Sequence, residues 1–452
     1  MKLESVSQKI AALFANLRCL VEKIQSIRGM NDILPRDINA WRHIENVAAK
    51  TFSSYGYGEI RFPILERTAL FKRAIGEVTD IVEKEMYTFD DKGGDSVTLR
   101  PEGTASCVRA CEQHGMLYNQ TQRLWYAGPM FRYERPQKGR LRQFHQIGAE
   151  AFGFDDVSIE VEMMLIAKRV FSSLGLIGNV CLQINTIGSA QSRQKYKGVL
   201  IEYLEQNIQK LDTESQRRLF TNPLRIFDSK DNGTQEVLRA APRLMDYLDE
   251  KSRERFDTFQ EQLSVFGIEF VVNHGLVRGL DYYNDTVFEW VTRDLGSQGA
   301  VCAGGRYNGL VETLGGSACS AFGFAMGLER LSMMLEAKSE HDPTNSNVCD
   351  IFVVGEGGCV LESLAVAEDI RSKLPNVNVC TNINGGSFKT QFKRADKSGA
   401  LVAIVVGADE LSSGMLAIKD LRKTGEQTVV SKDAVVDQLK RHFNACSSPI
   451  GG

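Results

Sequence analysis

The stretch that decides the fold is residues 123–153, RLWYAGPMFRYERPQKGRLRQFHQIGAEAFG. Its aromatic first half, Leu124 to Glu134, and its alternating second half, Leu141 to Phe152, predict the two strands of a β-hairpin. Between them, residues 135–140 (RPQKGR) hold no apolar residue except the proline. The sequence therefore predicts a hairpin with a strongly cationic loop.

The second strand separates two different faces, because successive side chains of a strand point in opposite directions. One face holds, in order, Phe144, Gln146, Gly148 and Glu150. The other, small and mostly apolar, holds His145, Ile147, Ala149 and Ala151. By the same period Arg132 and Glu134 share a face of the first strand, so charged, amide and aromatic groups are expected to converge on one sheet surface. The alternative is a solvated hairpin with its charged residues outside.

The composition is that of an ordinary globular protein. The 452 residues predict two or three domains, and the chain is 43% hydrophobic and 25% charged. A net charge of -3 does not indicate a nucleic-acid partner, so any contact with a polyanion depends on local basic patches. The densest such patch is the segment 132–142.

Cysteine and histidine spacing argues against a structural metal. The 10 cysteines include no C-x-x-C pair and the 6 histidines show no zinc spacing, which favours free thiols in a reducing compartment. No apolar run is long enough to span a membrane. Residues 1–26 predict a helical extension without a secretory core, and its acidic residues weaken a transit-peptide interpretation. We expect a cytoplasmic protein, with an additional mitochondrial pool left open.

The N-terminal third predicts several elements that could border a site. A helical stripe follows Pro35, and residues 58–66 (GEIRFPILE) predict an edge strand interrupted by Pro63, either a dimer surface or a capped edge. A hairpin over 86–99 leads into residues 100–104, RPEGT, before a helix at 105–113. There Gly103 permits close approach of a ligand, whereas Glu102 alternatively only stabilises the helix N-terminus.

The middle of the chain changes composition twice. After a helix over 158–174 and a strand over 180–187, residues 189–267 turn helical and charge-rich, which predicts a helical insertion into an α/β core. Sheet character returns at 268–273 and is followed by LVRGLDYY (276–283) and TVFEWVT (286–292). In AFGFAMGLERLSMML (321–335) small residues alternate, which leaves a bare face for a flat ligand or for close strand-to-helix packing.

The C-terminal part predicts a separate domain. Residues 339–347 have the composition of a linker. Beyond them, strands alternate with helices up to about residue 446, which predicts a small, mostly parallel α/β domain. One of its helices carries the cations Lys389, Lys393, Arg394 and Lys397, either a solvated face or an RNA contact.

Taken together, the motifs resemble those of class II aminoacyl-tRNA synthetases, and among them the histidyl-tRNA synthetase family, over residues 27–443. Phe131-Arg132-Tyr133-Glu134 with Arg140 to Phe144 is similar to class motif 2. The alternating small residues ending in Glu329-Arg330 resemble motif 3, with Ala325 at the middle small position. LVRGLDYY and GGRYNGL (304–310) are similar to the signatures of the histidine enzymes, although Asn308 stands where the family usually has an acidic residue.

The resemblance implies an α+β catalytic core, built on a mainly antiparallel sheet flanked by helices, over residues 27–338. This domain would include the helical insertion at about 189–267, and the linker at 339–347 would lead to an anticodon-binding α/β domain at 348–446. The implied reaction has two steps. Histidine and ATP give histidyl-adenylate and pyrophosphate, and the histidyl group then passes to the terminal ribose of tRNA.

The resemblance also implies the site residues. Arg132 and Arg278 would act catalytically on opposite sides of the α-phosphate. The implied histidine pocket comprises Glu102, Gly103, Thr104, Arg132, Gln146, Glu150, Arg278, Tyr282, Tyr283 and Tyr307. The implied ATP contacts are Arg132, Arg140, Phe144, Arg278 and Arg330. Glu102 and Thr104 would bind the α-ammonium group, Glu150 and Tyr283 the imidazole, and Phe144 and Arg330 the two faces of adenine.

The implied ligands are histidine, ATP and the tRNA for histidine. Mg²⁺ would accompany ATP as a counter-ion without dedicated protein ligands, and no organic cofactor is expected. The 138–142 loop would contact the tRNA acceptor end and the C-terminal basic helix the anticodon, in a homodimer without membrane contact. Two rival hypotheses are a catalytically inactive paralogue that regulates or senses tRNA, and a class II enzyme for glycine or proline.

Overall fold

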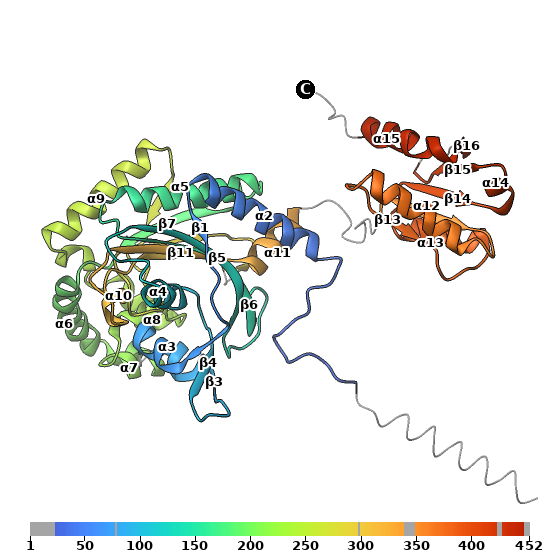
Figure 1. The fold of residues 1–452 in the computed structure, drawn as a ribbon. Helices are drawn as coiled ribbons and strands as arrows, with labels where there is room; N and C mark the ends of the chain where they lie inside the picture. Colours follow the sequence, from blue (N-terminus) through green and yellow to red (C-terminus); the bar gives the residue numbers. More distant parts are fainter. Residues whose placement is uncertain (1–22, 77–78, 297–298, 339–348, 423–426, 447–452) are drawn as a thin grey trace, which may run out of the picture. The chain divides into compact units, whose positions relative to one another are not determined.

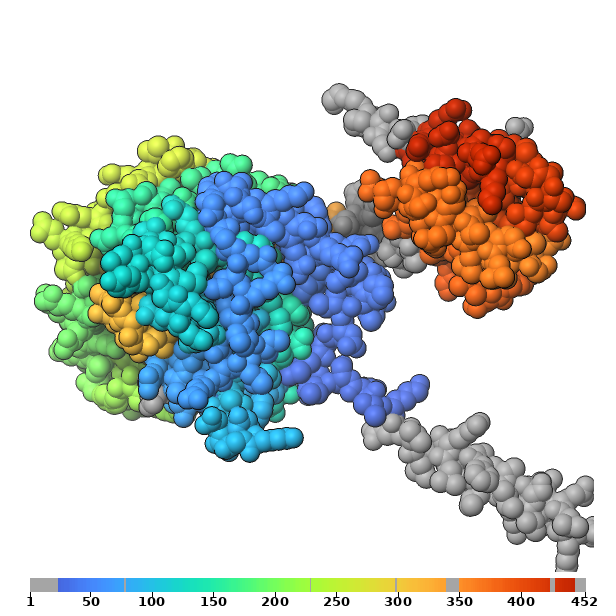
Figure 2. Space-filling model, viewed as in Figure 1, coloured from blue at the N-terminus to red at the C-terminus, as the bar shows by residue number. Residues whose placement is uncertain are grey.

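The chain divides into two compact units, residues up to 339 and residues from 340, which are described separately. The computed structural model describes residues 23–76, 79–296, 299–338, 349–422 and 427–446 (Figures 1 and 2). Residues 1–22 of the helical extension expected over 1–26, and the linker expected at 339–347, lie outside these residues; residues 23–26 are described and are not helical.

A mainly antiparallel sheet forms the centre of the first unit, as the sequence predicts. Its order is β1-β5-β6-β11-β10-β9-β7-β8, and only the outer pairs β1–β5 and β7–β8 are parallel. The strands are β1 (Gly58–Glu59), β5 (Gln122–Phe131), β6 (Gln143–Phe152), β7 (Cys181–Thr186), β8 (Phe270–Val272), β9 (Asn284–Val291), β10 (Ala300–Arg306) and β11 (Ala321–Gly327). The predicted hairpin is the pair β5–β6, in which Tyr126 lies opposite Gly148.

Helices cover both faces of this sheet (Figure 1). The face with Ile147, Ala149 and Ala151 packs on α2 (Ile38–Ser54), α5 (Ser158–Ser173), α9 (Glu250–Val265) and α11 (Leu328–Lys338). The opposite face packs on α3 (Thr68–Ile75), α4 (Thr104–Gln113), α6 (Ala190–Gln206) and α10 (Leu310–Thr313). The period of two along β6 thus decides which side chains enter the core and which remain for a site.

The first unit also contains a second, three-stranded sheet. It has the order β2-β4-β3, with β2 (Leu65–Arg67), β3 (Tyr87–Asp90) and β4 (Ser96–Leu99). A π-helical turn, Ile81–Glu85, precedes β3. Because β4 runs into Arg100 and Pro101, residues 102–104 lie at the start of α4, as the sequence predicts.

The region 189–267 is helical throughout its main elements. Four of its helices, α6, α7 (Thr213–Arg218), α8 (Asn232–Arg239) and α9, begin after a residue whose side chain accepts a backbone N–H bond. These N-caps are Ser189, Asp212, Asp231 and Asp249. Their side chains accept hydrogen bonds from backbone N–H groups that have no partner inside the helix. These four polar residues therefore define where each helix begins. Short 3₁₀ helices connect them at Ile208–Lys210, Pro223–Asp228 and Leu244–Tyr247.

The second unit has a mixed sheet, so the expectation of a mostly parallel one was wrong. Its order is β13-β12-β14-β15-β16, and the last two pairings are antiparallel. The strands are β12 (Ile351–Gly355), β13 (Val379–Thr381), β14 (Val402–Val406), β15 (Met415–Asp420) and β16 (Gln427–Ser431). The helices are α12 (Val360–Lys373), α13 (Phe388–Lys397), α14 (Ala408–Ser412) and α15 (Val435–Cys446). Because β15 runs antiparallel to β14, the short helix α14 is long enough to connect the two strands. The sequence pattern did not indicate that the chain reverses direction here.

The structure shows one irregular segment and corrects one further expectation, the shared strand face of Arg132 and Glu134. The segment LVRGLDYY is irregular, because Leu276 to Tyr283 lie between β8 and β9 without joining the sheet. Likewise β5 ends at Phe131, so Arg132 and Glu134 follow the strand and share no strand face. Neither segment belongs to a strand, so the side chains of both are available to line a site.

Candidate active site

A cavity of about 760 Å³ opens on the polar face of the hairpin. Ten of the predicted residues line it: Glu102, Thr104, Arg132, Arg140, Phe144, Gln146, Arg278, Tyr282, Tyr283 and Arg330. The three others, Gly103, Glu150 and Tyr307, lie directly behind this lining, since Thr104 bonds to Glu150 and Glu150 to Tyr307. The structure therefore brings the whole predicted set together.

The inner end of the cavity is built on the carboxylate of Glu150, which is fully buried. Its Oε1 accepts hydrogen bonds from Thr104 Oγ1 at 2.8 Å and Tyr126 Oη at 3.0 Å, and its Oε2 accepts one from Tyr307 Oη at 2.5 Å. Burial raises the pKa of Glu150 to about 8, although these hydroxyl donors favour the charged form. The group therefore titrates close to neutral pH.

Glu102 lies both at the N-terminus of α4 and on the cavity wall. Its carboxylate accepts from the backbone N–H of Thr104 at 2.7 Å and of Ala105 at 2.9 Å, at the N-terminus of α4. It also lines the cavity. Burial raises its pKa, against the opposing effect of the two N–H groups. Capping the helix thus fixes an acidic group at the cavity wall.

Three tyrosines pack beside Glu150. The rings of Tyr282 and Tyr283 lie 4.6 Å apart, and the ring of Tyr307 lies 5.6 Å from that of Tyr282. Burial raises the pKa of Tyr282 and Tyr307 well above the usual value for tyrosine, so both remain neutral hydroxyl groups. Together they give the inner end aromatic walls with polar tips.

The outer end is dominated by arginines that already have partners. Arg132 Nε donates to the carbonyl of Pro101 at 2.8 Å, and its guanidinium lies 5.2 Å from the centre of the Phe144 ring. Arg140 pairs with Glu134 at 2.5 Å. In a separate contact, Arg330 Nε donates to the carbonyl of Gly139 at 3.0 Å. All three arginines line the cavity.

Arg278 and Glu289 form an ion pair that the sequence did not suggest. Both side chains are about four-fifths buried and both line the cavity. Arg278 also lies over the ring of Tyr283, 5.8 Å from its centre. Glu289 occupies an alternate polar position within TVFEWVT, which was the available signal for it.

A second missed contact ties the two class motifs to each other. The carboxylate of Glu329 accepts from the backbone N–H of His145 at 2.9 Å and contacts its ring Nδ1 at 3.1 Å. Since His145 follows Phe144 and Glu329 precedes Arg330, this bond sets the spacing between the two groups expected to hold adenine.

The small residues of β11 serve two purposes. Ala325 and Gly327 border the cavity, which fits the expected bare face. A Cβ at Gly323, however, would lie 1.7 Å from Glu150 Oε2. Gly323 therefore makes room for a carboxylate of the protein rather than for a flat ligand.

The helical region 189–267 supplies one wall of the cavity through Arg218, Arg225 and Lys230, none of which was predicted. Arg218 and Arg225 pair with Asp80 at 2.8 and 3.3 Å. The sequence of a charge-rich helical region does not indicate which of its basic residues will lie at the cavity, next to Asp80.

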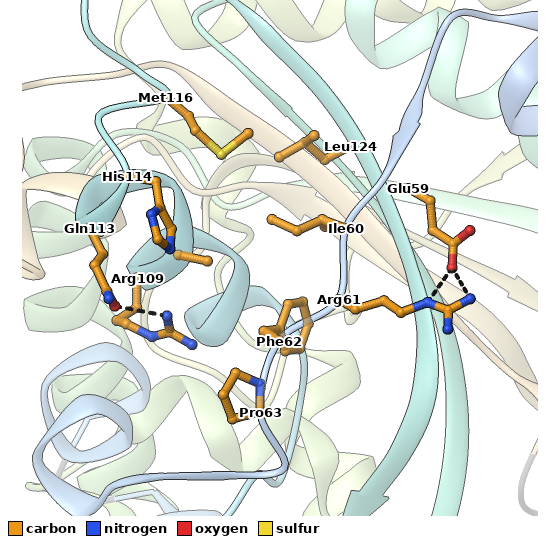
Figure 3. A pocket seen from close by; sticks show the side chains of 11 residues that line it. Glu59, Ile60, Arg61, Phe62, Pro63, Arg109, Gln113, His114, Met116 and Leu124 are labelled. Atoms are coloured by element: carbon orange, nitrogen blue, oxygen red, sulfur yellow. Dashed lines mark hydrogen bonds and ion pairs between the residues drawn. The ribbon is translucent and has the colours of Figure 1, made fainter.

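A separate hollow of about 420 Å³ lies along the edge strand. Residues 59–63 form one side, and α4 with the residues after it forms the other; the two segments meet at the surface (Figure 2). Figure 3 shows Ile60, Phe62, Met116 and Leu124 as its apolar walls. At its rim, Arg109 Nη1 donates to Gln113 at 3.1 Å.

Comparison with known proteins favours the histidine enzymes over the class II enzymes for glycine or proline. Residues 29–331 match the family described as Histidyl-tRNA synthetase, and residues 349–442 match the Anticodon binding domain. The chain belongs to the histidyl-tRNA synthetase family. It ligates histidine to its tRNA, through histidyl-adenylate, with release of AMP and pyrophosphate.

Solved structures agree with this assignment. The apo histidyl-tRNA synthetase of S. aureus is 36% identical, with a TM-score of 0.76, over 92% of this chain and 100% of that one. The histidyl-tRNA synthetase of Nostoc sp. PCC 7120 is 20% identical, with a TM-score of 0.65, over 93% and 100%. A Bacillus halodurans protein described as an ATP phosphoribosyltransferase regulatory subunit/histidyl-tRNA synthetase is also 20% identical, with a TM-score of 0.61, over 86% and 99%. The last two show the fold alone.

Proposed function

We propose that histidine binds at the inner end of the cavity, with its imidazole on Glu150. The single observation that carries this proposal is the buried Glu150 carboxylate held by three hydroxyl groups. Its α-ammonium group lies against Glu102 and Thr104, and Tyr283 contacts the ring from the other side. Gln146 lines the cavity between these groups, close to the substrate carboxylate.

This arrangement explains selectivity for histidine. Glu150 titrates near neutral pH, so an arriving ring N–H or imidazolium favours its carboxylate form. A competing amino acid without such a donor leaves buried polar groups unpaired. The free-energy cost of these unpaired groups strongly weakens its binding relative to histidine.

ATP binds at the outer end. Arg132 and Arg278 contact the α-phosphate from opposite sides, and Phe144 and Arg330 enclose adenine. Attack of the histidine carboxylate builds negative charge on the phosphorus, and fixed guanidinium groups stabilise that charge without reorganising. The permanent charge and planar fork of arginine suit both the phosphate and the stacking contacts.

Magnesium accompanies the triphosphate and neutralises part of its charge. The carboxylates nearest to this end, Glu134 and Glu289, each pair with an arginine. The described residues contain no cluster of three side chains that could hold a metal ion. In this proposal the phosphates of ATP supply most of the ligands for Mg²⁺.

The tRNA contacts involve both units. The acceptor end meets the 138–142 loop, and the anticodon meets α13, whose Lys389, Lys393, Arg394 and Lys397 are all exposed. Salt dependence of tRNA binding should weaken when these lysines are removed, because each phosphate contact releases counterions.

The enzyme acts as a homodimer through the segment at β1. The apolar hollow between residues 59–63 and α4 supports this surface, since an unpaired edge strand beside an apolar depression favours association. The described cysteines are free thiols, which favours the cytoplasm. Among the described helices, none combines the length and apolar character needed to cross a membrane.

Histidine-dependent exchange of pyrophosphate into ATP tests the site. Wild-type protein should exchange with histidine only, and Glu150→Gln should raise the KM for histidine about tenfold or more, the loss of a hydrogen bond to a charged group. An unchanged KM for histidine in Glu150→Gln would refute the proposed imidazole contact. Exchange by an inactive paralogue would be absent altogether.

A further inference from the structure

Tyr126 lies against Glu150 but belongs to no predicted set of site residues. Its hydroxyl donates to Glu150 Oε1 at 3.0 Å, the same oxygen that accepts from Thr104. The side chain is almost fully buried, and in the β5–β6 pairing it lies directly opposite Gly148.

Two glycines create the space that the tyrosine ring occupies. A Cβ at Gly103 would lie 2.2 Å from Tyr126 Cε2, and a Cβ at Gly148 would lie 2.3 Å from Tyr126 Cζ. Neither is compatible with a side chain larger than hydrogen, so both backbones must be bare for this ring position. The ring of Phe62 packs edge-on at 5.1 Å on another side. The hydroxyl is therefore fixed in direction before substrate arrives.

The acceptor positions of Glu150 are nearly filled by the protein. A carboxylate has about four lone-pair positions. Tyr126 and Thr104 occupy Oε1, and Tyr307 occupies one position of Oε2. The second acceptor position of Oε2 has no hydrogen-bond partner among the described residues.

We propose that Tyr126 is a positioning residue for histidine recognition: with Thr104 it fills Oε1 of Glu150 and so directs the remaining Oε2 acceptor at a ring N–H of the substrate. This inference rests on the proposed contact between Glu150 and the imidazole. Tyr126 would act on recognition without touching the substrate. The same role explains why residues 103 and 148, which lie against the Tyr126 ring, are glycines.

Removing the hydroxyl has a further consequence for titration. The titratable groups that face Glu150 are Glu102 from the loop before α4, Cys107 on α4, Tyr126 on β5, and the tyrosines Tyr282, Tyr283 and Tyr307. Without the Tyr126 donor the charged form of Glu150 loses a hydrogen bond, so its pKa rises further. The pH at which histidine binds well rises with it.

The experiment compares Tyr126→Phe with Tyr57→Phe. Tyr57 is an equally buried tyrosine whose hydroxyl donates to Glu162 at 3.1 Å, outside the cavity. Histidine-dependent pyrophosphate exchange is measured from pH 6 to 9, with the KM for each substrate. Tyr126→Phe should raise the KM for histidine about tenfold at neutral pH, leave the KM for ATP within about twofold, and move the pH dependence of the histidine KM upward. Tyr57→Phe should change neither KM.

A melting temperature separates this role from simple packing. If Tyr126→Phe is less stable than Tyr57→Phe and loses affinity for both substrates equally, or if its histidine KM and pH profile match wild type, the inference is overturned. The variant Glu150→Gln distinguishes a failure of the proposed imidazole contact from a failure of the positioning role of Tyr126. If that variant also keeps its KM for histidine, the imidazole contact itself is wrong; if only Tyr126→Phe is unchanged, the contact stands and the positioning role fails.

Discussion

The two ends of the cavity are built in opposite ways. At the inner end, Glu150 and Tyr307 are buried from solvent, and one short hydrogen bond joins them. At the outer end, Arg140 is 44% exposed on its side chain and pairs with a single carboxylate. The proposed histidine pocket therefore relies on buried hydrogen bonds, whereas the proposed ATP site relies on the permanent charge of arginines. The following substitutions test that contrast, from the largest expected effect to the smallest.

Arg278→Ala should cause the largest loss. Pyrophosphate exchange should fall about 10³-fold, about 4 kcal/mol of transition-state stabilisation, because the cation opposite Arg132 is gone. Histidine binding, measured by calorimetry, should remain within about threefold. Arg278→Ala combined with Glu289→Gln controls for the carboxylate left unpaired. Normal exchange by the single variant would show that Arg278 does not act on the phosphate.

Gly323→Ala should damage the inner end alone. Its Cβ would lie 1.7 Å from Glu150 Oε2, so the carboxylate or β11 must move. We expect the KM for histidine to rise about 100-fold, about 2.7 kcal/mol, with a smaller change in the KM for ATP. Gly178→Ala is the control, because a Cβ there meets nothing within 4 Å. Equal increases in both KM values would show that the two ends are not independent.

Glu150→Gln should change how stability depends on pH. In the folded protein the pKa of Glu150 is about 8, above its unfolded value, so the folded state binds the extra proton. Wild-type stability therefore falls as pH rises from about 4.5 to about 8. Glutamine does not titrate, so the melting temperature of the variant relative to wild type should increase across this range. A constant difference would mean that the pKa of Glu150 is ordinary.

Glu134→Gln should have the smallest effect. It frees Arg140 from a partly exposed ion pair, which contributes about 0 to 1 kcal/mol. The KM for ATP should fall about twofold and the KM for histidine should not change. Added salt should reduce the difference, because exposed charges are screened. A rise in the KM for ATP would instead show that Glu134 holds Arg140 in its productive position.

Much of the inner end was predictable because it lies within one hairpin. The alternation of β6 predicts that Gln146 and Glu150 share a face, and the pairing of Tyr126 with Gly148 follows once the hairpin register is known. No secondary structure was predicted from the sequence for residues 276–283, which are irregular in the structure. The structure packs Tyr282 and Tyr283 around a ligand site.

The amino-acid sequence alone was enough to predict a separate C-terminal unit, the hairpin, and the motifs of the histidyl-tRNA synthetase family. These depend on local periodicity and on residues close together along the chain. Only the tertiary structure decided that Arg278 meets Glu289, that Glu329 holds His145, and that Arg225 of the helical region reaches Asp80. Such contacts join segments 11 to 184 residues apart, and no local pattern specifies which of many charged side chains the folded sheet brings face to face.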